Sequence, residues 1–165
     1  MLKHLPVIFL ILLSNAAYGK TESHILQQVS APIEILSYSA SYRSPDRGIG
    51  DGKIIHRVNV KNTSSKEIVA YGIGLQVFDA FNRSLDRPFV GYDMSNLPVD
   101  EALQPGWEQR ALSAYLFKGY GTGVAYVAIV RFRDGTIWKA DPTNISNQVT
   151  DLELELEDDT GLSNE

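Results

Sequence analysis

Apolar and polar residues alternate in short runs along most of this 165-residue chain, and that alternation constrains the fold more than any other feature. A period of two places successive side chains on opposite faces, as in a β-strand with one buried face. The clearest run covers residues 69–77, with a predicted apolar face of Val69, Tyr71, Ile73, Leu75 and Val77. Gly72 and Gly74 on the opposite face indicate close packing of a neighbouring backbone or a bulge.

Turn-forming residues divide the alternating region into about seven short strands. Besides 69–77, the predicted strands cover residues 33–42, 54–60, 89–92, 107–116, 124–133 and 136–140. The last two flank Asp134-Gly135, a dipeptide typical of two-residue hairpin turns because such turns require positive φ angles. The pattern predicts an all-β fold, an immunoglobulin-like antiparallel β-sandwich over residues 32–140. Prolines around 89–92 favour an edge position for that strand.

The period changes after residue 140. Asp141 suits a helix N-cap, and Pro142 suits the first helical position, where its missing N–H costs nothing. One helical stripe would contain Ile145, Val149, Leu152 and Leu156. A strand is the alternative, because every second residue from 152 to 156 is leucine. The sequence favours a short C-terminal amphipathic acidic helix over residues 141–157, followed by a disordered acidic tail over residues 158–165.

The first 19 residues have the pattern of a secretory signal peptide, with predicted cleavage between Gly19 and Lys20. A basic start at Lys3 precedes an apolar run over residues 5–13. This run is too short to span a membrane, which takes about 20 residues. We therefore expect a periplasmic or secreted protein that begins with an N-terminal segment, residues 20–31, and has no membrane insertion after cleavage.

Composition excludes several classes of function. Without cysteine, the chain has no disulfide framework, no Cys-ligated zinc and no thiol nucleophile. A formal net charge of -5 argues against nucleic acid as a partner. That charge is uneven, because residues 20–150 carry 14 basic and 13 acidic side chains, whereas residues 151–165 carry seven acidic side chains and no basic one. A solvated acidic segment is favoured over a site for a basic partner.

Candidate catalytic groups are few. Only His24 and His56 follow the predicted signal peptide, and a zinc site needs three or four ligands. His56 alternates with Ile54 and Val58 on one strand face, which favours a structural role. The carboxylates that lie close together in sequence are Asp79, Asp86, Asp93, Asp100 and Glu101. Most of them neighbour turn residues, where aspartate hydrogen-bonds to local backbone, so we expect no enzyme activity and no cofactor.

Three stretches resemble the FxLYD-type immunoglobulin-like domains of bacterial extracytoplasmic proteins. They are Leu75-Gln76-Val77-Phe78-Asp79, Leu103-Gln104-Pro105-Gly106 and Phe132-Arg133-Asp134-Gly135-Thr136-Ile137-Trp138. Phe78 stands where a tyrosine is usual in that family. The resemblance implies an immunoglobulin-like fold and structural roles in turns and a hairpin for Asp79, Pro105, Gly106, Asp134, Gly135 and Trp138. It implies no catalytic residue.

The leading functional hypothesis is a non-enzymatic protein-interaction domain that binds another extracytoplasmic protein. Its predicted binding surface lies in segment 86–105 and loop 118–123, with Tyr92, Trp107 and Tyr120, because loops on a rigid scaffold often carry recognition. Two alternatives remain open. One is a small-molecule or metal-ion carrier, with Asp46 and Asp51 in a glycine-rich bend as calcium ligands. The other is a carbohydrate-active hydrolase that uses paired carboxylates.

Overall fold

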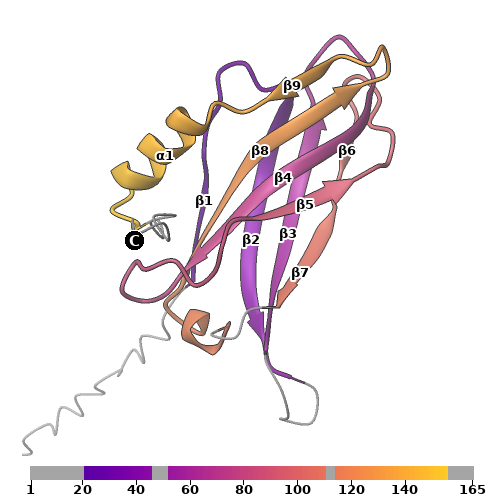
Figure 1. Cartoon of the computed structure of the whole chain (residues 1–165). Helices are drawn as coiled ribbons and strands as arrows, with labels where there is room; N and C mark the ends of the chain where they lie inside the picture. Colours follow the sequence, from indigo (N-terminus) through magenta and orange to yellow (C-terminus); the bar gives the residue numbers. More distant parts are fainter. Residues whose placement is uncertain (1–20, 46–51, 111–113, 156–165) are drawn as a thin grey trace, which may run out of the picture.

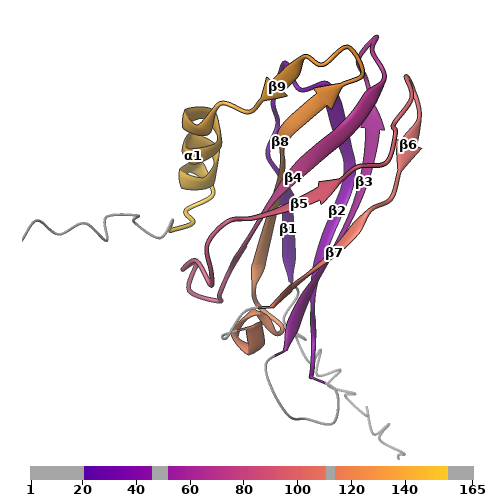
Figure 2. The same ribbon diagram turned by 45° about the vertical axis from the view of Figure 1, so that its right-hand side comes forward.

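The computed structural model describes residues 21–45, 52–110 and 114–155. The predicted signal peptide, the predicted acidic tail and the glycine-rich bend with Asp46 and Asp51 lie outside these ranges. Within them, nine strands form two β-sheets, accompanied by one 3₁₀ helix and one α-helix (Figures 1 and 2). The α-helix lies against one of the sheets. None of the described helices is both long and apolar enough to cross a membrane.

The four-stranded sheet is built on β3 (Lys53–Asn62). β2 (Ile33–Arg43) pairs antiparallel along one side of β3. Two short strands, β6 (Ala102–Leu103) and β7 (Gly106–Arg110), share the other side of β3. A bulge between Ile35 and Ser37 interrupts the β2–β3 register.

The five-stranded sheet has β4 (Ile68–Phe78) and β8 (Thr122–Phe132) paired antiparallel at its centre. β5 (Phe89–Asp93) pairs with the far side of β4, at the edge predicted for it. The other side of β8 is shared by β1 (Glu22–Ile25), which is parallel to it, and β9 (Ile137–Lys139), which is antiparallel.

The predicted all-β, two-sheet architecture is confirmed, with two corrections to its details. The sheets contain nine strands rather than about seven, and β1 makes the sandwich mixed rather than purely antiparallel. β1 lies in the segment 20–31 that the sequence places before the sandwich, because its four residues are too few to show an alternation. The predicted strand 107–116 is wrong at its end, since Ala114–Phe117 forms the 3₁₀ helix η2.

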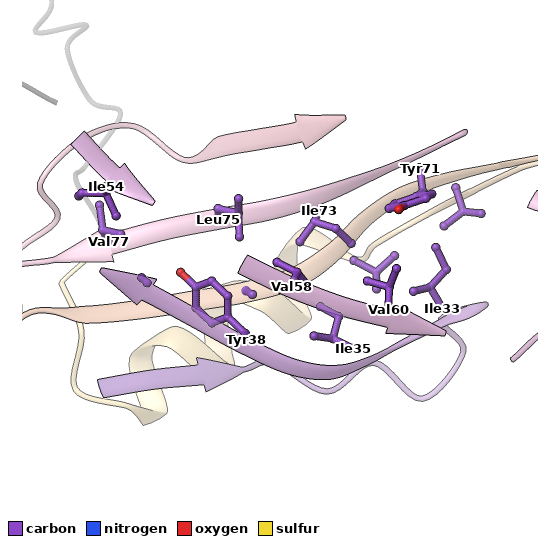
Figure 3. Packing of buried hydrophobic residues seen from close by; sticks show 14 of the residues in the cluster. Ile33, Ile35, Tyr38, Ile54, Val58, Val60, Tyr71, Ile73, Leu75 and Val77 are labelled. Carbon is purple, nitrogen blue, oxygen red and sulfur yellow. The ribbon is translucent and has the colours of Figure 1, made fainter. Parts of the chain in front are cut away.

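The hydrophobic core fills the space between the two sheets, where side chains from β2, β3 and β4 meet (Figure 3). The predicted buried face of 54–60 is confirmed, because Ile54, His56, Val58 and Val60 are all buried. The prediction for β4 is wrong at Val69, which is half-buried, while its neighbour Ile68 is fully buried. A bulge between Ile68 and Ala70 shifts the alternation there.

The β8–β9 hairpin has a three-residue loop instead of the predicted two-residue turn. Phe132 and Thr136 are joined by a backbone hydrogen bond of 3.0 Å, and Gly135 N–H donates to the carbonyl oxygen of Phe132. Gly135 has a φ of 85°, whereas Asp134 does not have a positive φ. This is the loop in which one glycine in the left-handed region ends the turn with a bulge. Asp134 accepts from the N–H of Thr136 at 2.9 Å and from Lys66 Nζ at 2.7 Å.

The C-terminal helix α1 (Pro142–Asp151) begins as predicted, with Asp141 Oδ1 accepting from Thr143 N–H at 2.9 Å. Its predicted extension to residue 157 is wrong. Glu153 has a φ of 58°, and the chain turns so that Glu155 N–H donates to the Asn82 carbonyl oxygen at 2.8 Å. Beyond the helix, Leu154 is buried at 6% exposure, in a cluster with Phe78 and Val124 of the sheet.

A second hydrophobic cluster joins this C-terminal segment to the outer face of the five-stranded sheet. Its buried members are Leu26, Phe78, Val124, Val149 and Leu154. They come from β4, β8, α1 and the residues that follow β1 and α1. The segment therefore covers one half of the outer face, on the side where β1 pairs with β8 (Figure 1), and leaves the half near β5 and β9 open.

Candidate functional site

The three aromatic residues of the predicted binding surface do not lie together. Tyr92 on β5 pairs with Gly72, which in turn pairs with Ile129 on β8. Tyr120 lies two residues before Thr122, where β8 begins, and Thr122 lies seven residues before Ile129. At about 3.3 Å per residue this separation is about 23 Å along the sheet. Tyr92 and Tyr120 are thus both exposed, but at different ends of the molecule.

Trp107 covers the edge of β5. Its indole Nε1–H donates to the carbonyl oxygen of Tyr92 at 3.2 Å. The ring lies directly on Gly91, where a Cβ atom would be 2.4 Å from the indole Cδ2. Trp107 is half-buried and packs against the core. It shields an edge strand rather than offering a free aromatic face.

Tyr92 belongs to the open half of the outer face of the five-stranded sheet. It borders an apolar pocket of about 170 Å³ together with Met94, Ile129 and Ile137. We call these four residues the apolar platform. Tyr92 is 64% exposed, Met94 83% and Ile137 50%. Large apolar side chains that gather around a pocket on a soluble domain commonly mark a contact surface.

Two glycines of β4 leave space for the side chains on this face of the sheet. A Cβ atom at Gly72 would lie 2.9 Å from Ile129 Cγ2 and 3.1 Å from Tyr92 Cε1. A Cβ atom at Gly74 would lie 2.2 Å from the ring of Tyr126. The close neighbours of these glycines are therefore side chains of β5 and β8, and not the neighbouring backbone that the sequence predicts. The register does shift between Gly72 and Ile73, but the extra residue of that bulge is in β8.

Two charged residues stand at the rim of the pocket. Arg131 of β8 is exposed and makes no ion pair within the described part of the chain. Asp93 of β5 accepts from Ser95 N–H at 2.7 Å, a local turn contact. An apolar floor beside a guanidinium that makes no ion pair in the described residues is suited to a partner that presents an apolar side chain next to a carboxylate.

Asp79 and Asp93, two of the clustered carboxylates, lie too far apart for a catalytic pair. Asp93 lies opposite Tyr71, whereas Asp79 follows Phe78 at the other end of β4. Eight residues of strand separate them by about 26 Å, and glycosidase carboxylates lie about 5–9.5 Å apart. Asp86 accepts from Arg87 N–H at 2.8 Å, and Asp100 lies 3.7 Å from Lys61 Nζ. The backbone carbonyl oxygen of Glu101 accepts a hydrogen bond from the N–H of Asn62.

Asp79 organises the turn that follows β4. Its carboxylate accepts from the N–H groups of Phe81 at 2.8 Å and Arg83 at 3.1 Å, and from the Arg83 guanidinium at 3.0 and 2.7 Å. Burial raises the pKa of Asp79, but the hydrogen bonds from Arg83 and the backbone outweigh it and hold the pKa below its usual value. With its oxygens committed to these donors, Asp79 is not available as a proton acceptor for a substrate.

His56 is fully buried between the two sheets. Its Nδ1 lies 3.0 Å from the Tyr38 hydroxyl, and its Nε2 lies 3.1 Å from Gln109 Oε1. The ring stacks on Tyr38 and on Phe89. Because Oε1 only accepts, Nε2 carries the proton and Nδ1 accepts from Tyr38. Burial lowers the pKa of His56 to about 4, against a raising contribution from Gln109.

The described residues contain no cluster of side chains that could bind a metal ion. No group of three or more histidine, aspartate or glutamate side chains is arranged there to hold an ion. His24, on β1, lies 3.5 Å from Glu22 and far from His56 in sequence and sheet.

The remaining turn residues support strand ends. The Pro105 carbonyl oxygen accepts from Val58 N–H at 3.1 Å, and β7 begins at the adjacent Gly106. Trp138 on β9 pairs with Val130 and packs against the core at the edge of the sheet.

The sequence predicts a binding surface at Tyr92 but none of the residues that surround it on the platform. Ile129 faces outward because Ala128 is an extra residue in β8, between the pairs Gly72–Ile129 and Ile73–Val127. No local pattern reveals that bulge. The outward position of Ile137 could have been predicted, because its neighbour Trp138 packs inward and successive side chains of a strand face opposite sides.

No known protein family matches this chain, and no curated protein matches it. A solved structure described as "X-ray structure of Northeast Structural Genomics Consortium target SoR45" is similar in shape. It shares 13% identity with a TM-score of 0.47, over 66% of this chain and 80% of that chain. A likeness at this level carries no argument about function.

Proposed function

We propose that this chain is a periplasmic or secreted, non-enzymatic protein-interaction domain that binds its partner on the apolar platform. The observation that supports this most is the open half of the outer face, where Tyr92, Met94 and Ile137 are exposed around one apolar pocket. The extracytoplasmic location rests on the signal peptide pattern of residues 1–19. The immunoglobulin-like, FxLYD-type relationship rests on the sequence motifs and agrees with a two-sheet fold.

The partner is another extracytoplasmic protein that presents an apolar side chain to the pocket and a carboxylate to Arg131. A pocket of about 170 Å³ is smaller than the roughly 300 Å³ or more typical of small-molecule sites, which favours a single side chain as its occupant. Aromatic residues and methionine are the types enriched at the centres of protein interfaces. The C-terminal segment closes the rest of the face, so the contact is limited to the platform and its rim.

Site-specific photocrosslinking in intact host cells tests this proposal. With a photoreactive phenylalanine in place of Tyr92, we expect one discrete protein adduct that disappears when Arg131→Glu is added. The same group in place of Arg110, an exposed residue of β7 on the side of β3 away from β2, serves as the matched control and should give no such adduct. An adduct that persists in Arg131→Glu, or that forms equally from position 110, would exclude the platform as the binding surface.

A further inference from the structure

β2 has one unpaired edge, and the hydrogen bonds of β3 identify which groups lie on it. Val58 N–H donates to the Pro105 carbonyl oxygen, and Asn62 N–H donates to that of Glu101. Even-numbered residues of β3 therefore direct their backbone groups toward β6 and β7. The odd-numbered residues, such as Arg57 and Asn59, direct theirs toward β2, because successive residues of a strand alternate.

The residues of β2 opposite the even-numbered positions of β3 must point their N–H and C=O groups away from β3. In the register these are Ile33, Ile35, Tyr38, Ala40 and Tyr42. No other strand pairs with this edge within the described residues. A pocket of about 230 Å³ borders it at Ile33, Glu34 and Ile35, and separates these residues from residues 25–28, which line the other side of the pocket. The edge of β5, by contrast, is shielded by Trp107.

We propose that two copies of this chain associate by antiparallel pairing of their β2 edges around a two-fold axis at Ser39. In this register Tyr38 of each copy lies opposite Ala40 of the other, so that the outward backbone groups of both residues meet. The bulge between Ile35 and Ser37 then brings Tyr42 opposite Ile35 of the second copy. In all of these residues the backbone N–H and C=O groups point away from β3, and the interface forms on the order of eight backbone hydrogen bonds.

Side chains support the same register. On the outer face, Glu34 lies opposite Arg43 of the second copy, which gives two cross-strand ion pairs per dimer. The exposed residues of β2 between them are Leu36, at the bulge, and Ser37, Ser39 and Ser41, whose small side chains leave room for those of the second copy. The Arg43 guanidinium binds Glu108 Oε1 at 3.0 Å and has further N–H donors for Glu34. A shift of two residues would separate the opposite charges, so the charges select this register.

Sedimentation velocity on the chain without its predicted signal peptide, up to millimolar concentration, tests the pairing. We expect a concentration-dependent dimer that weakens about tenfold in Glu34→Arg and in Arg43→Glu, because each variant places like charges opposite one another. The double variant Glu34→Arg/Arg43→Glu should recover the dimer, since the charges are exchanged but still complementary. Ala40→Pro, which removes an outward N–H, should abolish it, whereas Ser39→Ala should not.

A chain that stays monomeric at all concentrations would overturn the proposal, as would a dimer that the single variants leave unchanged or that the double variant does not restore. Glu34 makes no ion pair in the described residues, so Glu34→Arg reports on the dimer without disturbing the fold. Urea unfolding of each variant verifies this. The platform lies on the other sheet, so platform binding and β2 pairing succeed or fail separately.

Discussion

Lowering the pH from about 6.5 to about 4 should remove about 3 kcal/mol from the free energy of unfolding because of His56 alone. The folded protein holds this imidazole neutral at 0% exposure, and its burial lowers the pKa to about 4. In the unfolded chain the pKa returns to its ordinary value of about 6.5. Between these values the unfolded state binds one more proton, so stability is complete above the upper value and falls as the pH decreases.

The groups around His56 make this loss specific to the imidazole. Tyr38, Phe89, Trp107 and Gln109 surround or pair with it, and none of them carries a charge that could stabilise an imidazolium. Carboxylates such as Glu67 and Glu108 also have lowered pKa values, but they reduce stability only at pH values below about 4.5.

Urea unfolding measured across this pH range checks the prediction. His56→Gln retains a hydrogen-bonding side chain that does not titrate, so its stability should depend little on pH between about 6.5 and 4.5. His24→Gln is the matched control, since it removes the other histidine of the described chain, and it should keep the wild-type slope. Equal slopes in wild type and His56→Gln would show that this histidine is not held neutral in the folded protein.

Val149→Asp should detach the C-terminal segment and lower the free energy of unfolding by about 3 kcal/mol. Val149 is 1% exposed and packs with Leu154 against Phe78 and Val124. A carboxylate cannot remain there without a partner, so the segment from α1 to Glu155 is expected to leave the sheet. The loss corresponds to two buried apolar side chains at roughly 1.5 kcal/mol or more each.

Asn147→Asp introduces the same charge on the exposed side of α1 and should change stability by less than about 0.5 kcal/mol. Urea unfolding gives the energies, and limited proteolysis reports the release of the segment. In Val149→Asp we expect rapid cleavage within residues 141–155 while the sandwich stays intact. If both variants were equally resistant to cleavage, the second hydrophobic cluster would not hold this segment.

The sequence predicted the elements whose signals are local. Strict alternation located β3, and an Asp-Pro pair located the start of α1, because strand faces and helix caps depend on residues close in the chain. Bulges are different, since they depend on the partner strand. They moved Val69 off the core face and turned Ile129 outward, and neither effect follows from the residues themselves.

The same limit applies to the candidate site. Tyr92 was predicted to lie on a binding surface because it belongs to the proline-interrupted segment 86–105, but its neighbours come from β8, β9 and the residue after β5. Only the register of three strands brings them together. The role of Trp107 likewise depends on Gly91, a residue of another sheet that accommodates its ring. Such pairs are not visible in one sequence.

Oxidative footprinting in intact host cells, compared with the purified protein, tests most directly whether the platform is the partner-binding surface. Tyr120 is the internal reference, because it is as exposed as Tyr92, at 64% for each. The proposal predicts that labelling of Tyr92 and Met94 falls several-fold in cells while labelling of Tyr120 is unchanged. Equal labelling of Tyr92 and Met94 in cells and in the purified protein would contradict it.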